Sequence, residues 1–397
     1  MATALRRAIR AGIIAVFLAI GATHADAATF KVLHDFRNQG DGSNPNTALA
    51  LDYADGFLFG TTSEGGANGF GTAFEVSVYG DFFRTIHAFT PSEGRSRSPV
   101  ILRNGHLFGT ACNASGFGVV YRLGMEGGLQ PLYRFASLTT PDNSRTPYRP
   151  LGAIDIDRFG NLYGATAAGG ANGWGTIYRV NLNAPGTAET LFSFEGQTFE
   201  TTATPVAGIV YYGGYLYGLT APVRNQHRLG TTTLFRVPST GGRMTALSVF
   251  QDRISDPSRE DGDLIFDKTA NGVVGALREG GEHRLGLLFR YTIGARTAEE
   301  FDFNQDVIPS VYFPGSGVVA HGGYYYGTTT QGGRSDRGTV YKFRLGHEEE
   351  PFAVHQFGGR DGEAPLAGLT IDPHGNIYGV TSHGGRYGYG VVFKIEP

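Results

Sequence analysis

The chain has 397 residues, of which 17% are charged and 61 are Gly, and its formal net charge is −3. Glycine is at about twice its usual share and charge is below the usual quarter, which excludes a disordered polyelectrolyte and a coiled coil. The small net charge gives no overall field that would favour nucleic acid or an anionic membrane. Because 20 Tyr and 28 Phe are dispersed among the glycines, we expect many short strands and turns and few helices.

The first 27 residues have the features of a secretory signal peptide. Three Arg lie between residues 6 and 10, an apolar run covers Ala11 to Ala22, and Ala25-Asp26-Ala27 fits an A-x-A cleavage site. The apolar run is too short for a bilayer span, which needs about 20 residues. We therefore predict a signal peptide at 1–27, no membrane span, and a secreted or periplasmic protein whose residues 28–397 form a single domain.

A segment of the type aromatic-Gly-x-Thr recurs along the chain, as in Leu162-Tyr163-Gly164-Ala165-Thr166. A worn copy, Val273-Val274-Gly275-Ala276, fills one gap. The Gly of the segment stands at positions 60, 109, 164, 218, 275, 327 and 379. Regular spacing of about 50 residues is typical of a repeat architecture. The sequence therefore contains seven copies of one unit.

Each unit holds three further apolar runs besides the aromatic-Gly segment. The run that follows carries an aromatic residue at one place: Phe74, Tyr121, Tyr178, Phe235, Phe289, Tyr341 and Phe393. The next run closes on a Phe: Phe89, Phe135, Phe194, Phe250, Phe303 and Phe357. The run before the aromatic-Gly segment is usually entered through a Pro: Pro45, Pro99, Pro150, Pro205, Pro314 and Pro365. Four short strands per unit predict the blade of a β-propeller.

The two ends of the chain complement each other. The sequence stops at Pro397 soon after Phe393, so the last unit lacks a closing Phe run. The segment Phe30 to Phe36 is similar to Phe352 to Phe357 and precedes the first unit. We therefore predict an all-β, seven-bladed β-propeller whose N-terminal strand completes the last blade, a three-plus-one seam that leaves no free sheet edge there.

The unit also resembles a known family. Leu162 to Thr166, followed by Gly169 to Tyr178, is similar to the Gly-rich GloVer tandem repeats of exported bacterial proteins, and the likeness covers residues 30 to 397. The resemblance implies an exported protein with propeller-like repeats. It assigns no activity and no catalytic residue.

Candidate site residues come from comparing the loops between the second and third strands, which share one face of a propeller. Three residues before the Gly that opens the third strand, the seven units have Asn68, Ser115, Asn172, His227, His283, Ser335 and Tyr387. Two neighbouring blades thus carry His-Arg-Leu-Gly at this place. The loops of blades 4 to 7 contain seven Arg and those of blades 1 to 3 none. We expect a one-sided basic site at the channel mouth.

The residue types in these loops suit an acidic ligand. His titrates near neutrality and acts as an acid or base, and Arg binds carboxylates through a planar fork. The catalytic candidates are His227, His283 and Tyr387. The ligand-binding candidates are Arg228, Arg284, Arg334, Arg337, His383, Arg386 and Tyr389. The alternative is structural: nearby Glu and Asp can pair with these Arg at the rim, and common ancestry of blades 4 and 5 explains the repeated His-Arg.

Three function classes remain open. The first is a non-enzymatic module that binds a glycan or cell-envelope component, with an acidic polysaccharide as one form of it. The second is a polysaccharide lyase or glycosidase acting on a uronate-containing glycan with His, Tyr and Arg, and the third is a structural or protein-interaction scaffold. We expect a monomer that binds no nucleic acid.

No cofactor is predicted. Neither a Cys/His metal spacing nor a Gly-x-Ser-x-Gly elbow is present. Asp41-Gly42 and Asp361-Gly362, each shortly before a Pro, offer oxygens to Ca²⁺ but first predict turns. Cys112 is the only cysteine, so no disulfide forms within the chain.

Overall fold

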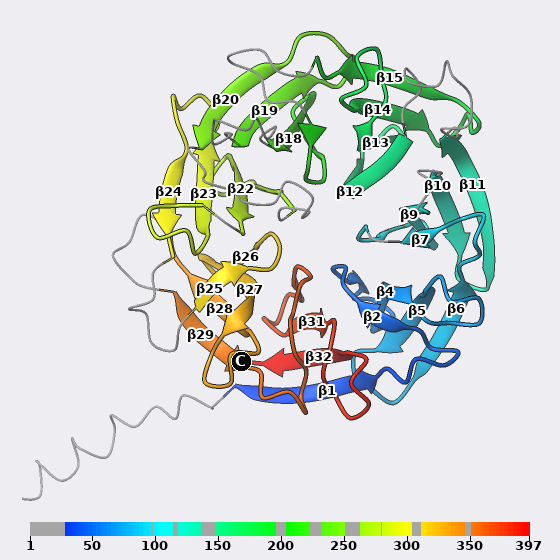
Figure 1. Ribbon diagram of the computed structural model, residues 1–397, viewed down its shortest axis with the longest axis vertical. Coiled ribbons are helices and arrows are strands. Elements are labelled where there is room, and N and C mark those ends of the chain that lie inside the picture. Colours follow the sequence, from blue (N-terminus) through cyan, green and yellow to red (C-terminus); the bar gives the residue numbers. More distant parts are fainter. Residues whose placement is uncertain are drawn as a thin grey trace, which may run out of the picture.

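The computed structural model describes residues 28–96, 98–113, 118–135, 148–195, 204–221, 232–250, 263–278, 280–303, 311–345 and 351–397. The predicted signal peptide, His227 and Arg228 lie outside these residues. Within them every regular element is a strand. Seven antiparallel sheets stand around a central axis, which confirms the seven-bladed β-propeller (Figure 1).

The first four blades follow the chain in order. Blade 1 contains β2 (Ser43–Pro45), β3 (Ala50–Asp52), β4 (Phe57–Glu64), β5 (Thr72–Ser77) and β6 (Phe83–Ala88). Blade 2 contains β7 (Arg95–Ser96), β8 (Ile101–Arg103), β9 (His106–Cys112), β10 (Gly118–Gly124) and β11 (Gly127–Phe135). Blade 3 contains β12 (Tyr148–Ile156), β13 (Asn161–Ala168), β14 (Thr176–Asn181) and β15 (Ala188–Ser193). Blade 4 contains β16 (Thr204–Pro205), β17 (Val210–Tyr212), β18 (Tyr215–Ala221), β19 (Thr232–Pro238) and β20 (Thr245–Phe250).

The last three blades complete the ring. Blade 5 contains β21 (Ile265–Asp267), β22 (Gly272–Leu277), β23 (Leu287–Thr292) and β24 (Glu299–Asp302). Blade 6 contains β25 (Val311–Pro314), β26 (Val319–His321), β27 (Tyr324–Gly332), β28 (Thr339–Phe343) and β29 (Phe352–Gln356). Blade 7 contains β30 (Thr370–Ile371), β31 (Ile377–Thr381), β32 (Val391–Glu396) and, from the other end of the chain, β1 (Thr29–Asp35).

The seam lies in blade 7, as predicted. Strand β1 pairs antiparallel with β32, from Thr29 opposite Glu396 to Asp35 opposite Val391 (Figure 1). The Phe30 ring stacks on that of Phe393, with centroids 5.6 Å apart. The N-terminal strand therefore covers the edge of the C-terminal strand and joins its aromatic core.

The Gly of the repeated segment is required by packing against the third strand. A Cβ atom at Gly327 would lie 2.5 Å from the Tyr341 hydroxyl oxygen, and one at Gly379 would lie 2.5 Å from Phe393 Cζ. The same contact occurs in all seven blades. The seven third-strand aromatics are at most 1% exposed, which confirms that they form the core. Since the tip of each ring contacts a Gly, the two residues recur together.

Several pairs of neighbouring blades are joined by an equivalent backbone hydrogen bond, at the start of the first strand of the second blade. The backbone N–H of Asn44 donates to Tyr389 O of the preceding blade at 3.1 Å, and that of Ala364 donates to Arg337 O at 3.0 Å. Both donors precede a Pro and have positive φ, 57° for Asn44 and 53° for Ala364. The left-handed backbone is unfavourable for Ala364 and less so for Asn44, since Asn adopts it more readily than other non-Gly residues. The bond between blades offsets this cost.

One feature of the repeat differs from the prediction. Pro45 pairs with Thr62 in blade 1, whereas in blade 2 Ser96 pairs with Ala111 at the corresponding register position. Pro99 therefore does not enter the first strand of blade 2. Ser96 Oγ instead lies 3.1 Å from the buried Tyr121 hydroxyl, a contact that a Pro could not make.

Candidate functional site

The predicted site lies on the face that carries the loops between second and third strands, which we name the loop face. In blade 7 this loop holds Tyr387 and Tyr389, each 41% exposed. The Arg386 guanidinium lies 5.5 Å from the centre of the Tyr387 ring, and that of Arg37 lies 5.4 Å from it. We call Arg37, Arg386, Tyr387 and Tyr389 the blade 7 platform. It combines two exposed phenol rings with two cations.

Backbone hydrogen bonds hold the platform in place. The N–H of Arg386 donates to the Asp35 carboxylate at 2.7 Å. The carbonyl of Tyr389 accepts from Asn44, and Gly384 forms a bridge with Tyr389. The N-terminal segment that carries Asp35, Arg37 and Asn44 therefore shapes the platform as well as closing the ring.

The remaining sequence candidates divide into three groups. His383 is exposed in the same blade 7 loop, with Nδ1 3.1 Å from Ser382 Oγ. His283 and Arg284 are exposed in blade 5. In the described part of the chain, no hydrogen bond or ion pair joins them to blade 7. The structure therefore assembles the blade 7 candidates and leaves those of blade 5 apart.

In blade 6 the two Arg candidates behave differently. The Arg337 guanidinium forms an ion pair with the Glu363 carboxylate. This pair fits the structural alternative of rim ion pairs. The Arg334 side chain is exposed, and no described Asp or Glu pairs with it.

A second column of loop residues was missed in the sequence. The residue directly before the Gly that opens the third strand is aromatic in blades 1, 2, 3 and 7: Phe70, Phe117, Trp174 and Tyr389. Trp174 is 39% exposed, and Phe70 lies under the Arg95 guanidinium at 5.4 Å. Phe117 is outside the described residues. Aligning the loops at this position would have shown that the aromatic side of the loop face extends from blade 7 through blades 1 to 3.

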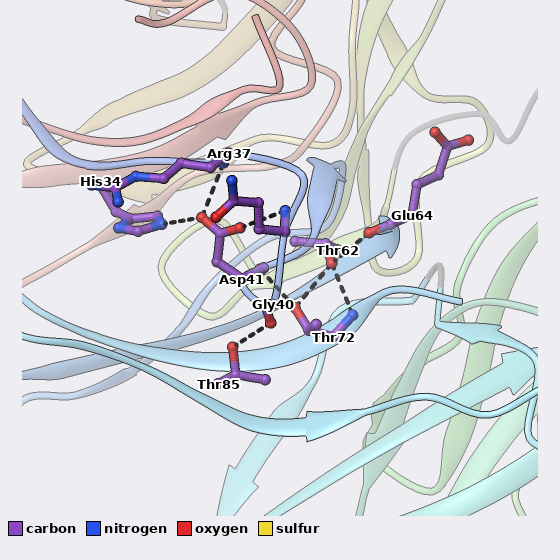
Figure 2. A network of polar contacts seen from close by, with 9 residues as sticks. His34, Arg37, Gly40, Asp41, Thr62, Glu64, Thr72 and Thr85 are labelled. Atoms are coloured by element: carbon purple, nitrogen blue, oxygen red, sulfur yellow. Dashed lines mark hydrogen bonds and ion pairs between the residues drawn. The ribbon is translucent and has the colours of Figure 1, made fainter. Parts of the chain in front are cut away.

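The His residues of the outer strands form structural pairs. His34 Nε2 lies 3.2 Å from the Asp41 carboxylate, which also accepts the N–H groups of Arg37 and Gln39 (Figure 2). Burial raises the pKa of Asp41, but these hydrogen bonds outweigh it and hold that pKa below its usual value.

The same pair recurs in two other blades, His87 with Glu93 at 3.0 Å and His355 with Asp361 at 2.9 Å. Gly358 N–H also donates to Asp361. Asp41 and Asp361 thus organise turns, and nowhere in the described ranges do three or more His, Cys, Asp or Glu gather into a possible metal site.

Comparison with known sequence families supports the repeat found in the sequence. The Gloeobacter/Verrucomicrobia repeat matches residues 19–148 and 223–397. The chain belongs to this family. No match was found among curated proteins.

Solved structures share the fold of this Gloeobacter/Verrucomicrobia repeat protein. An oligogalacturonate lyase in complex with manganese is 10% identical, with a TM-score of 0.56 over 93% of this chain and 96% of that chain. An oligogalacturonate lyase from Vibrio parahaemolyticus is 9% identical, with a TM-score of 0.54 over 93% and 97% of the two chains. At these identities the likeness shows the fold alone. The described residues of the repeat protein contain no helix long and apolar enough to cross a membrane.

The innermost segments of the repeat protein place small residues beside the axis. Directly before a buried apolar residue stand Ala48, Pro99, Ala153, Gly208, Asp263, Gly317 and Gly368. A Cβ at Gly368 would lie 3.5 Å from that of Ala48, so blades 7 and 1 meet closely here. Asp263 is the one charged residue of this set. Burial raises the pKa of its carboxyl to about 6, although a hydrogen bond from the backbone N–H of Ala153 opposes the rise.

Replacing Asp263 by Asn is expected to stabilise the protein at pH 8 by about 3 kcal/mol, because one pKa unit corresponds to about 1.4 kcal/mol. Its folded pKa is above the unfolded value of 3.8. The folded state therefore binds the proton more tightly, and the wild-type protein loses stability as pH rises from about 4 to about 6. Urea unfolding of both proteins at pH 4 and pH 8 measures this. Equal differences at the two pH values would contradict the prediction.

Proposed function

We propose that the protein is an exported β-propeller that binds an acidic glycan on its loop face. The blade 7 platform carries this proposal. Exposed aromatic rings stack against the C–H faces of sugars, and guanidinium groups bind carboxylates through paired hydrogen bonds. Among the described residues, no Asp or Glu side chain pairs with the Arg37 or Arg386 guanidinium. Both cations therefore stay available to a ligand.

The same face offers room for a chain of sugars. Trp174 and Phe70 supply further aromatic surface on blades 3 and 1. Arg334 and Arg284 supply exposed cations on blades 6 and 5. A polymer with repeating carboxylates suits such separated contacts better than a small molecule would. The signal peptide predicted at 1–27 supports a role in the periplasm or outside the cell.

The binding test is a calorimetric titration of the purified protein with oligogalacturonate and, separately, with neutral maltooligosaccharides. We expect oligogalacturonate to bind more tightly, with an affinity that falls as salt is added. Tyr387→Ala and Arg386→Ala should each weaken binding about tenfold, as for a buried aromatic or Arg contact at an interface. Arg296→Ala, an exposed Arg in the turn after β23, is the matched control and should change nothing. Equal binding of the two glycans, or unchanged affinity in both platform variants, would overturn the proposal.

A lyase acting on a uronate-containing glycan is the second candidate. The solved structures named oligogalacturonate lyases have this fold, and His283, His383 and Tyr387 are exposed on the loop face. In such a reaction a base removes the proton beside the carboxylate. The C–H electron pair becomes a C=C bond while the glycosidic C–O bond on the next carbon breaks, and the leaving oxygen takes a proton. Absorbance of the unsaturated ends measures the reaction directly, and no increase in absorbance on incubation with oligogalacturonate would count against the lyase.

A further inference from the structure

A cavity lies on the face opposite the loop face, where the short turns of each blade emerge. It opens between blades 2 and 3 and has a volume of about 390 Å³. Its walls include Arg103, His106 and Arg122 of blade 2, and Arg158, Phe159 and Asn183 of blade 3. No Asp or Glu is among the described residues that line it. We name it the turn-face cleft.

Among the described residues the charge of Arg122 has no acid partner, unlike that of its counterparts in blades 3 and 5. The residue after the third-strand aromatic pairs with an acid in blade 3, Arg179 with Glu189, and in blade 5, Arg290 with Glu299. In blade 2 the residue opposite Arg122 across the sheet is Gln130, which accepts its hydrogen bond but carries no charge. Among the described residues no acid pairs with Arg122, so its full charge faces the cleft.

The other two guanidinium groups, those of Arg103 and Arg158, also have no acid partner within the described ranges. Arg103 Nη1 donates to the backbone carbonyl of Asp157 at 2.5 Å, which fixes Arg103 across the boundary between the blades. Arg158 lies 4.6 Å from the centre of the Phe159 ring, which is 62% exposed. The Asp157 carboxylate turns away, accepting hydrogen bonds from Asn161 and Tyr163 within blade 3.

The corresponding cleft between blades 5 and 6 differs from the turn-face cleft in the charge of its lining residues. It has a similar volume, about 420 Å³, but Asp267 lines it and Arg290 in its wall is paired with Glu299 at 2.6 Å. The position between blades therefore does not by itself produce an excess of positive charge. The excess arises from the side chains of blades 2 and 3.

We propose that the turn-face cleft is a second saccharide site, which binds a sugar carrying a carboxylate or sulfate group. The anion would contact the guanidinium groups of Arg122 and Arg158, and the sugar ring would stack on Phe159. A volume of about 390 Å³ is within the range of small-molecule sites and exceeds what a free phosphate ion needs. The exposed ring beside the cations adds an apolar contact that a bare anion does not use. This site does not depend on the proposed function of the loop face.

The test uses a protein with Arg386→Ala and Tyr387→Ala, which removes the loop-face contacts, titrated with digalacturonate, a sulfated disaccharide, maltose and inorganic phosphate. We expect the two acidic disaccharides to bind and maltose not to bind. Arg158→Ala should weaken acidic disaccharide binding at least fivefold and reduce its dependence on salt. Phe159→Ala should weaken disaccharide binding but leave phosphate binding unchanged. Arg344→Ala, in the cleft between blades 5 and 6, is the matched control.

Three results would overturn the proposal. The first is that the acidic disaccharides do not bind to the background variant. The second is that their binding is unchanged after Arg158→Ala. The third is that phosphate binds as tightly as the disaccharides and that Phe159→Ala has no effect on disaccharide binding. If the wild-type protein binds acidic disaccharides and this binding is lost with Arg158→Ala but not with the loop-face variants, the function proposed for the loop face fails and the turn-face site stands. Because Arg158 and Phe159 are exposed, both variants should fold, and thermal melting checks this.

Discussion

Deleting residues 28–37 is expected to lower the free energy of unfolding by more than about 5 kcal/mol, which is a large part of the stability of a typical domain. The deletion removes β1, exposes the edge of β32 and takes Phe30 and Phe36 from the core. Phe36 is fully buried and contacts the Phe74 ring at 5.2 Å. Each large aromatic lost from a core costs about 3 to 5 kcal/mol. Denaturant unfolding of the truncated and complete proteins measures the difference.

A synthetic peptide of residues 28–37 provides the control. If the deletion acts by opening the seam, the peptide should bind the free β32 edge and restore part of the lost stability. A peptide with Phe30 and Phe36 replaced by Ser should not. Lys31→Ala in the complete chain removes an exposed side chain and its hydrogen bond to the Tyr79 carbonyl, and should lower stability by no more than about 1 kcal/mol. A truncated protein that unfolds like the complete one would refute the role of β1 in closing the ring.

The repeat made most of the fold predictable. Each blade contains the same Gly in contact with an aromatic ring, so the divergent copy with Gly275 and Phe289 could still be located by its spacing. Pro99 was misplaced for a reason visible in the sequence. Ten residues separate Pro99 from Gly109, whereas 13 to 15 separate the other Pro from their Gly. Ser96, 13 residues before Gly109, keeps the usual spacing and takes the register position.

The site was less predictable because it depends on contacts between distant segments. Arg37 reaches Tyr387 only because the N-terminal strand lies in blade 7. Whether an exposed Arg pairs with an acid depends on side-chain positions that the loop sequence does not specify. Arg337 pairs with Glu363 of the following loop, whereas no acid in the described part of the chain pairs with Arg386. The turn-face cleft was missed because its basic residues come from three separate turns and strands of two blades.

Gly327→Ala is expected to destabilise the protein by several kcal/mol although it adds one methyl group. The three atoms nearest to the new Cβ all belong to Tyr341, the closest at 2.5 Å, and Tyr341 is fully buried. The ring has no free space to move into, and overpacking a core costs about 1 to 3 kcal/mol or more. Tyr341→Ala alone should cost about 3 to 5 kcal/mol through the cavity it leaves. Urea unfolding of the two single variants and the double variant measures all three values.

The double variant distinguishes this packing from a requirement for Gly in the backbone. If the Tyr341 ring is the reason for Gly327, the new methyl group enters the space that the ring vacates, and the double variant should be no less stable than Tyr341→Ala alone. The coupling between the two changes would then equal the whole cost of Gly327→Ala. Gly323→Ala offers a contrast, because its φ is 80° and nothing lies within 4 Å of the added Cβ. That variant should lose stability through backbone strain, with no coupling to Tyr341. Additive costs for Gly327 and Tyr341 would show that the repeated Gly serves something other than the ring above it.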